Sequence, residues 1–547
     1  STNWPSLGTT HAASNIWNYG TINLTGLGFL QVTGNFVNNG IINCEDDGVG
    51  LTGSSAQKIY GNGTVGILNI LNSNGVSIST STGDTVKLSK DLKLSTGVLT
   101  TNGRLIIKSD ASGSGRISNI SSGISGNVTV ETFIPSGRRA YRFLGHPFAA
   151  AQSMSSLTDD IFVTGDGTDV GTGGSTGTGL DATGSNAASS WWFDNTTNAW
   201  KAFATASDVS WAQYAGARVM VRGDRTQTAT LTGGADVPNA VTLDMTGAIN
   251  TGNQNISLPT AGNYHFVSNP YPSPTDIGTV IDALGTGVLG TQYWVWDPRS
   301  ATRGAYVPKT VGGGAYSIPM SSAFIVQPIS STTLAFTEAN KTASATAGNS
   351  YFKTNSKGNM QLQLLYNNYP ADYFTLNLNE KSLVNKDEKD GEKLMNSDMN
   401  FYSFTTDGKK LSLDTRPLDQ EDVVKLAIST NVKTSYKIKV ASFGIENTEV
   451  YLKDNYTNSI TKLEAGVEYS FEVTTEAASQ GANRFELVMK ASPVVLPSST
   501  LEVKMSPNPV KDVLTVSYSN PIEAVATVRI INSKGQILQT QSLGNTA

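Results

Sequence analysis

Residues 18–23, Asn-Tyr-Gly-Thr-Ile-Asn, return at residues 38–43 as Asn-Asn-Gly-Ile-Ile-Asn, and this repeat decides how the first part of the chain is interpreted. A period of roughly 20 residues is typical of one coil of a stacked β-solenoid. Asn-Gly turns are also a strong signal for β-hairpins, so an antiparallel sandwich stays open as the alternative. We predict that residues 1–132 form a repetitive β region of one of these two kinds.

A second repeat lies in the middle of the chain. Residues 141–148, Tyr-Arg-Phe-Leu-Gly-His-Pro-Phe, recur at residues 264–271 as Tyr-His-Phe-Val-Ser-Asn-Pro-Tyr. In each copy an aromatic hairpin follows, and each copy then closes on an apolar strand. We therefore predict two related β units in tandem, at residues 133–250 and 251–345.

The duplication makes a sharper prediction, which is that Phe143 and Phe266 occupy equivalent buried places. The first unit is longer because residues 164–186 form a tract rich in Gly, Thr and Asp. Such a tract is too polar to bury and too rich in glycine to hold a regular element. We expect it to be a surface loop.

The composition changes after the second unit. Residues 346–493 contain more Lys, Asp and Glu, and their apolar residues alternate with polar ones. This alternation is typical of an antiparallel sandwich with one face in water. Residues 494–504 follow as a Pro- and Ser-containing linker, and residues 505–547 form the last unit.

Composition supports one fold class for the whole chain. Of its 547 residues only 15% are charged and 54 are glycine, which favours strands and tight turns over helices. A chain of this length is too long for a single core. We predict an all-β, multidomain protein.

Charge and hydropathy exclude two classes of partner. The net charge is -5 and no basic stripe is visible, which argues against binding to nucleic acid. No apolar run approaches the ~20 residues of a transmembrane helix. The chain opens at Ser1 without the basic and apolar regions of a signal peptide, so for an exported protein we expect prior processing or a piece of a longer protein.

The lone cysteine limits the chemistry further. Cys44 is the only cysteine, which excludes an internal disulfide framework and any zinc site built from several cysteines. An exported bacterial protein that avoids cysteine fits this count.

The last stretch carries a distinct pattern, beginning Met-Ser-Pro-Asn-Pro-Val-Lys-Asp-Val-Leu-Thr-Val at residues 505–516. Its two prolines fix φ and remove two donors, so we expect the chain to enter extended. The alternation over residues 513–518 predicts a half-buried strand. A second strand is predicted at residues 528–531, followed by a tight turn at residues 532–535.

This pattern resembles the type A C-terminal sorting domain of proteins exported by the type IX secretion system of Bacteroidetes-type bacteria. The resemblance implies a small Ig-like β-sandwich that the type IX translocon and its outer-membrane shuttle barrel recognise. It also implies passage through the periplasm, and then secretion or retention at the cell surface. Members of that family continue through further strands, so residues 505–547 are expected to be a partial domain. The motif residues are Pro507, Asn508, Pro509, Val510, Asp512, Leu514, Lys534 and Gly535.

Candidates for catalysis are few. Only His11, His146 and His265 exist, and no two are close in sequence, so a structural role is favoured for the two that lie in the duplicated motif. No pair of carboxylates for glycoside hydrolysis stands out. We therefore predict that the chain is not an enzyme.

Two kinds of binding site remain as candidates. The tryptophans of the aromatic hairpins could stack on sugar rings, although cross-strand aromatic pairs also pin the register of a hairpin, and core packing is favoured. Acidic turns could bind calcium, although they have fewer ligands than calcium prefers, and solvated turns are favoured. No other cofactor is expected. The possible glycan contacts are Trp191, Trp192, Trp294 and Trp296, and the possible metal ligands are Asp166, Asp169, Asp387 and Asp390, with Asp181 near the first pair.

Residues 222–224, Arg-Gly-Asp, match the tripeptide that integrins bind, but the glycine is explained by a turn after the preceding strand. Residues 15–132 also resemble the repetitive parts of large Bacteroidetes surface proteins. We predict an adhesin-like, non-catalytic cargo of the type IX secretion system. The alternatives are a glycan-binding surface protein and a surface component of gliding motility.

Overall fold

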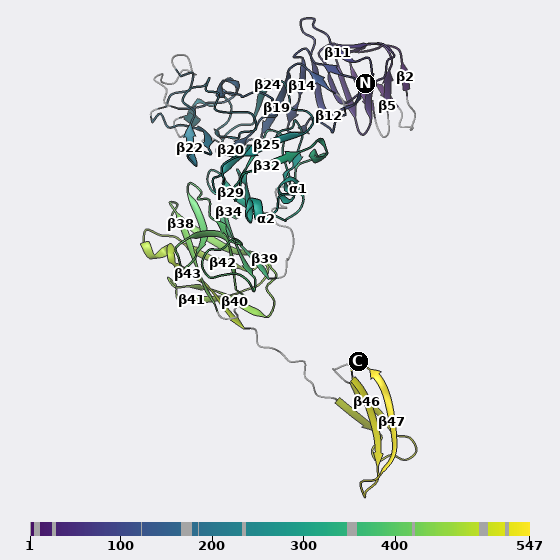
Figure 1. The fold of residues 1–547 in the computed structure, drawn as a ribbon, viewed down its shortest axis with the longest axis vertical. Helices are drawn as coiled ribbons and strands as arrows, with labels where there is room; N and C mark the ends of the chain where they lie inside the picture. Colours follow the sequence, from purple (N-terminus) through teal and green to yellow (C-terminus); the bar gives the residue numbers. More distant parts are fainter. Residues whose placement is uncertain are drawn as a thin grey trace.

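The all-β prediction is confirmed by the computed structural model, in which nearly every regular element is a strand (Figure 1). The two α-helices of the described part are short, α1 (Ile277–Asp282) and α2 (Thr286–Leu289), and none there is long and apolar enough to cross a membrane. The structure describes residues 2–4, 11–24, 29–121, 123–165, 178–183, 185–231, 237–346, 358–417, 422–491, 502–519 and 524–546.

The first region is a β-solenoid, in which each strand pairs in parallel with a strand of the next coil. Ile22 pairs with Ile42, and Ile42 with Val65, so the partners lie one repeat apart. The antiparallel sandwich that the Asn-Gly turns left open is therefore wrong. The main stack is β1 (Thr2–Trp4), β4 (Thr21–Leu24), β7 (Ile41–Cys44), β10 (Thr64–Leu71), β12 (Val86–Thr96), β14 (Leu105–Ile107) and β19 (Val128–Ile134).

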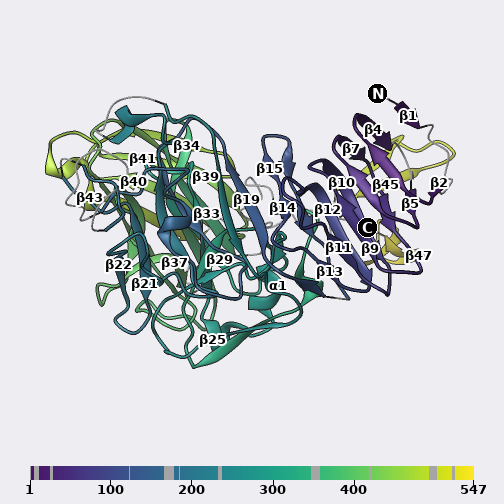
Figure 2. The same ribbon diagram turned by 90° about the horizontal axis from the view of Figure 1, so that it is seen from above.

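Other parallel strands complete the coils, and Figure 2 shows the stack running into the rest of the molecule. A second face is formed by β3 (Ile16–Asn18), β6 (Phe36–Asn38), β9 (Gln57–Tyr60), β11 (Val76–Ile78), β13 (Leu99–Thr100) and β18 (Ile124–Ser125). Further strands that join the main sheet are β2 (His11–Ala13), β5 (Phe29–Val32), β8 (Gly48–Leu51) and β17 (Arg116–Ile117). One small hairpin is formed by β15 (Ser109–Asp110) and β16 (Gly113–Ser114).

The repeated asparagines explain why the coils keep their register. The Nδ2 of Asn18 donates to the Oδ1 of Asn38 at 2.8 Å, and the Nδ2 of Asn38 donates to the carbonyl oxygen of Thr64 at 3.1 Å. Both asparagines are buried, and each hydrogen bond joins one coil to the next. Because a buried polar group needs a partner, a shift of one residue would leave these amides unpaired.

The end of the solenoid is covered by a strand from much later in the chain. β24 (Val241–Gly247) pairs antiparallel with β19, and its Val241, Leu243 and Met245 are buried. These apolar residues therefore cover the last coil, which would otherwise expose its core. Although the sequence places residues 241–247 in the first β unit, they pair with the solenoid sheet.

The two tandem units share one strand order, with the first strand next to the fourth, then the second and the third. In the first unit the order is β20 (Ala140–Leu144), β23 (Ala217–Val221), β21 (Ser190–Asp194) and β22 (Ala199–Ala202). In the second unit it is β26 (His265–Ser268), β31 (Ala323–Val326), β28 (Gln292–Asp297) and β29 (Ala305–Thr310). Two small sheets flank the second unit, β25 (Gln254–Leu258) with β32 (Thr332–Phe336) and β27 (Thr275–Asp276) with β30 (Ser317–Ile318).

The two units are also joined by two β-bridges, which use the same two positions of each unit. Leu144 of the first unit forms an antiparallel bridge to Ser322 of the second, and Ala215 of the first forms one to Val267 of the second. The registers of the two sheets make Leu144 equivalent to Val267, and Ala215 equivalent to Ser322. Each unit therefore presents the same two positions to the other.

The backbone at this junction repeats as well. Gly145 donates its N–H to the carbonyl oxygen of Ser321 at 2.9 Å, and the equivalent Ser268 donates to that of Tyr214 at 2.8 Å. Tyr214 and Ser321 have φ angles of 64° and 58°, a left-handed conformation that is uncommon for residues other than glycine. Two residues of different type thus adopt the same unusual backbone because the junction requires it.

Residues 358–491 form one hydrogen-bonded sheet of 11 strands. Most pairs are antiparallel as predicted, but Thr375 of β34 lies opposite Leu413 of β37 in a parallel pair, because the intervening β35 and β36 carry the chain across. The sheet contains β33 (Asn359–Tyr366), β34 (Tyr369–Leu378), β35 (Gly391–Glu392), β36 (Met399–Phe404), β37 (Lys410–Arg416), β38 (Val423–Thr430), β39 (Ser435–Phe443), β40 (Thr448–Asp454), β41 (Ser459–Leu463), β42 (Glu468–Glu472) and β43 (Gly481–Ala491).

The last four strands lie apart from this body in Figure 1. They form two antiparallel hairpins, each of two strands. The first hairpin is β44 (Glu502–Ser506) with β45 (Thr515–Ser519), and the second is β46 (Ala524–Ile531) with β47 (Ile537–Thr546).

Candidate functional site

The first hairpin of the tail places the proline motif in its loop. Ser506 pairs with Thr515, and residues 507–514 connect the two strands. The strand predicted from residue 513 therefore starts two residues later. The physical reason is that Pro507, which has no N–H, would be the next partner along β44. Val510 and Asp512 lie in this exposed loop.

The second hairpin turns where the sequence predicts. The Oδ1 of Asn532 accepts the N–H of Lys534 at 3.0 Å and that of Gln536 at 2.9 Å, and Gly535 has a φ of 81°. An asparagine acceptor followed by a left-handed glycine is the chemistry that such a turn requires. The preceding strand is longer than predicted, since it begins at Ala524.

Large apolar side chains of the tail are exposed. Leu538 is 67% exposed and Met505 is 56% exposed, and the two hairpins do not share a sheet. Half-exposed apolar residues also lie on both strands of the second hairpin, at Ile530, Ile531 and Ile537. The tail therefore presents apolar surface that the described part of the chain does not cover.

The tryptophans of the two aromatic hairpins are not grouped as a sugar platform. Trp294 is only 3% exposed, and the Nε1 of Trp296 donates to the carbonyl oxygen of Tyr141 at 2.8 Å. Trp192 packs against the core of the solenoid side, whereas Trp191 points to the opposite face of its strand. The possible glycan contact at Trp294 is therefore wrong, because its ring is buried and packs edge to face on the ring of Tyr264, with the centroids 5.6 Å apart.

Both histidines of the duplicated motif are buried and hydrogen-bonded. His146 is fully buried, and its Nδ1 accepts the N–H of Phe148 at 3.4 Å. Burial lowers the pKa of His146 to about 4. His265 is 3% exposed and its Nδ1 lies 3.0 Å from the Nδ2 of Asn195, whereas the side chain of His11 lies outside the described residues.

The carboxylates of the candidate metal ligands Asp387 and Asp390 accept hydrogen bonds from backbone N–H groups. The carboxylate of Asp390 accepts the N–H groups of Thr415 at 2.7 Å and Asp387 at 2.9 Å, and burial raises its pKa to about 6. Asp387 accepts the N–H of Leu383 at 2.9 Å. Among the described residues no three His, Cys, Asp or Glu side chains gather as metal ligands. Asp166 and Asp169 lie outside the described residues.

The arginine of the Arg-Gly-Asp tripeptide is buried and not exposed to solvent. Arg222 is 4% exposed, Gly223 has a φ of 93°, and Asp224 accepts a hydrogen bond from the Nδ2 of Asn239 at 2.7 Å. Gly223 is therefore explained by its turn, as expected. Asp181, grouped with the acidic tract in the sequence, instead forms an ion pair with Arg225 at 2.9 Å.

The structure brings together a group of arginines that the sequence analysis missed. Ala140 pairs with Val221 at the end of β20 and β23, so Arg139 and Arg222, the next residues outward, lie at the same end of the two strands. The guanidinium of Arg218 lies 4.0 Å from the centre of the Tyr141 ring on the same face. The alternation of Arg218 and Arg222 on one strand is the signal that could have revealed this face.

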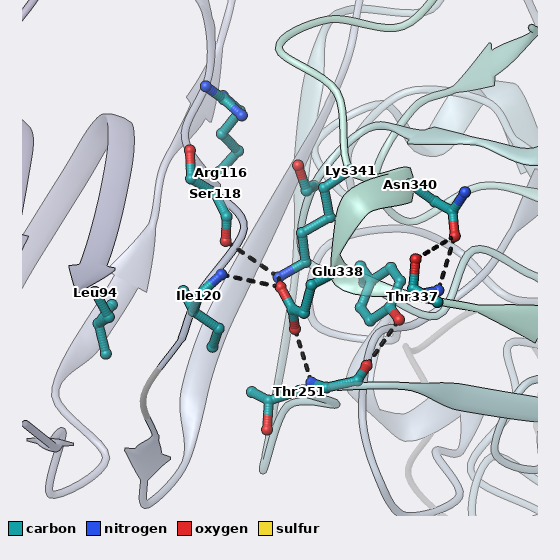
Figure 3. A network of polar contacts seen from close by, with 12 residues as sticks. Leu94, Arg116, Ser118, Ile120, Thr251, Thr337, Glu338, Asn340 and Lys341 are labelled. Atoms are coloured by element: carbon teal, nitrogen blue, oxygen red, sulfur yellow. Dashed lines mark hydrogen bonds and ion pairs between the residues drawn. The ribbon is translucent and has the colours of Figure 1, made fainter. Parts of the chain in front are cut away.

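A polar network joins the solenoid to the second unit (Figure 3). The carboxylate of Glu338 accepts the N–H groups of Ile120 at 3.2 Å and Gly252 at 2.7 Å. Lys341 forms an ion pair with Glu338 at 2.6 Å and donates to the carbonyl oxygen of Ser118 at 3.3 Å. The Lys341 side chain is 1% exposed, and this burial lowers its pKa. Glu338 therefore serves three partners from separate parts of the chain.

Comparison with known families identifies the class of protein that the tail defines. Residues 504–547 match the secretion system C-terminal sorting domain, which makes the chain a cargo protein of the type IX secretion system, exported to the cell surface or secreted. Residues 182–489, more than half of the chain, match the domain of unknown function DUF8693. The chain belongs to that family. No curated protein and no solved structure matches it.

Proposed function

We propose that this exported protein is an adhesin-like surface cargo without catalytic activity, in which residues 1–491 act as a stiff passenger. The observation that carries the proposal is that three junctions tie its modules together. The first is the Glu338 network between the solenoid and the second unit. The second is the pair of reciprocal β-bridges between the two units, Leu144 with Ser322 and Ala215 with Val267.

The third junction ties the second unit to the eleven-stranded sheet. The N–H of Tyr306 donates to the Oδ1 of Asn396 at 2.9 Å, and the Oγ of Ser412 donates to the Oε1 of Gln292 at 3.0 Å. These residues are all buried, so the hydrogen bonds are shielded from water. A body joined in this way suits the display of a surface at a distance from the cell.

The non-catalytic part of the proposal is supported by the roles of the titratable groups. His146, His265, Asp387 and Asp390 are all engaged in hydrogen bonds that hold local backbone or side chains. A general acid or base must instead face a substrate. We therefore assign these four side chains to the fold.

Attachment of living cells tests the proposal. Cells that produce the full chain should attach to a surface more than cells that lack it, and gliding should be unchanged. Loss of gliding with normal attachment would favour the motility alternative. Turnover of a polysaccharide or peptide library by the purified chain, lost on one Asp or Glu substitution, would overturn the non-catalytic assignment.

A further inference from the structure

Three arginines meet at one end of the junction between the two units. Arg139 directly precedes Ala140 of β20 and Arg222 directly follows Val221 of β23, and because Ala140 pairs with Val221 the two arginines lie at the same end of these strands. Arg303 lies in the turn between β28 and β29, and its carbonyl oxygen accepts the N–H of Tyr141 at 2.9 Å, which holds this turn against the edge of β20. Three positive side chains from separate segments thus converge on one place.

No carboxylate within the described ranges forms an ion pair with this positive charge. Like charges held close together repel each other. None of these three arginines forms an ion pair with an acidic side chain of the described residues. Asp181, whose charge acts on Arg222, is already bound by both terminal nitrogens of Arg225, at 3.0 and 2.9 Å.

Two of the guanidinium groups also contain a buried nitrogen that has no hydrogen-bond partner among the described residues. The Nε atoms of Arg139 and Arg222 are buried without a partner. Arg222 is 4% exposed, and its Nη2 donates a long hydrogen bond to the Oγ1 of Thr164 at 3.4 Å. Burial, followed by the charge of Arg139, lowers the pKa of Arg222 to about 10. A buried unpaired donor is costly, so its presence indicates a missing acceptor.

We propose that Arg139, Arg222 and Arg303 form an anion-binding site for the carboxylate or sulfate groups of an acidic polysaccharide. The planar fork of a guanidinium matches such groups with two parallel hydrogen bonds. The three side chains run from the surface inward, since Arg303 is exposed, Arg139 is half-buried and Arg222 is buried. An anion that enters past Arg303 would satisfy the inner donors.

Neighbouring rings favour a sugar over a bare ion. Tyr141 lies between Arg139 and Phe143 on the same face of the sheet, and it is half-buried. Trp191 lies opposite Arg218 on this face and is also half-buried. Partly exposed aromatic faces beside arginines suit the apolar face of a pyranose ring. The choice of a polysaccharide rests on the proposed attachment role, whereas the anion site rests on the arginines alone.

Titration calorimetry on the purified full chain tests the site without cells. The probes are an oligogalacturonate, a dextran sulfate and neutral dextran, with sodium sulfate compared against sodium chloride at equal ionic strength. We expect saturable binding of an acidic polymer and none of neutral dextran. Arg222→Gln and Arg139→Gln should each weaken binding at least tenfold. Arg222→Lys should weaken it too, because lysine keeps the charge but loses the fork.

Two further variants keep the result interpretable. Arg303→Gln changes an exposed side chain, so it should fold normally and still weaken binding severalfold. Arg529→Gln removes one positive charge from the exposed surface of the tail and should leave binding unchanged. Equal weakening by Arg529→Gln would show a general charge effect and overturn the site.

Other outcomes contradict the proposal in different ways. Sodium sulfate binding as tightly as the polymers would overturn the polysaccharide and leave a site for a free ion. If the wild type bound no probe but the double variant Asp166→Asn, Asp169→Asn did, carboxylates of the chain itself would be the occupant. Normal cell attachment without anion binding would overturn the site and leave the proposed function intact.

Discussion

The rings of Phe143 and Phe266 contact each other edge to face, with their centroids 4.6 Å apart and their planes at 65°. Each phenylalanine is the third residue of its copy of the duplicated motif, and they are 5% and 6% exposed. Their equivalence was expected from the sequence, but their mutual contact was not. The two copies are therefore packed against each other through the same position.

Replacing either phenylalanine should destabilise both units together. Phe143→Ala and Phe266→Ala should each lower the free energy of unfolding by about 3–5 kcal/mol, because each removes a buried ring from a shared cluster. The double variant should lose less than the sum, since both rings occupy one contact. Denaturant unfolding of the wild type, the two single variants and the double variant, monitored by tryptophan fluorescence, measures these free energies.

Tyr19→Ala provides the control, because Tyr19 is 73% exposed. Its effect should stay within about 0.5 kcal/mol. Strict additivity of the two phenylalanine variants would contradict a shared contact.

His146 should make the protein sensitive to acid. Its pKa in the folded state is about 4, below the ordinary 6.5, so the unfolded chain binds more protons between these values. Stability should therefore be complete above pH 6.5 and should fall by up to about 3 kcal/mol as the pH drops to 4. Unfolding midpoints at pH 7 and 4.5 measure the loss.

The second copy supplies the variant for this test. Asn269 stands where the first copy has His146, and its Oδ1 accepts the N–H of Tyr271 at 3.0 Å, as His146 accepts that of Phe148. His146→Asn should keep this hydrogen bond and reduce the loss of stability in acid. An unchanged pH profile would show that other groups cause the acid sensitivity.

Breaking the junction in Figure 3 should loosen the solenoid from the second unit. Glu338→Gln leaves Lys341 buried without its carboxylate, which should cost about 3–5 kcal/mol. Limited proteolysis should then cleave the chain more rapidly near this junction, because the segments that it joins separate more often. The exposed pair of Lys437 and Glu468 is the control, and Lys437→Gln should cost less than about 1 kcal/mol.

Removing residues 498–547 should separate export from folding. Among the described residues, the apolar cores of the body contain none beyond Met489, so its unfolding temperature should not change. The truncated protein should stay in the periplasm because the sorting domain is gone. Protease accessibility on intact cells measures this, and normal surface exposure of the truncated protein would contradict the role of the tail.

Local repetition made much of this fold predictable. The asparagines at positions 18 and 38 recur one repeat apart in the sequence, which predicts a coil. In the structure their side chains are hydrogen-bonded to each other. The motif around Phe143 and Phe266 predicts two units because its apolar and aromatic residues recur in order. Such signals lie within one short window of sequence, where periodicity is visible.

Features that depend on distant partners were not predictable. β24 covers the solenoid through pairs such as Val130 with Met245, more than 100 positions apart. The arginine site depends on which faces of β20 and β23 meet, and on a turn from the second unit. Alternation within one strand shows that two faces differ, but it does not show what covers each face.

The parallel stacking of the solenoid also has a consequence for evolution. Because each coil contacts mainly the coil before and the coil after it, gain or loss of one repeat would leave the first coil and the β24 cap unchanged. Each added coil would lengthen the stack by about 4.8 Å, the spacing between neighbouring strands. The length of the solenoid is thus a quantity that can change in steps, one repeat at a time.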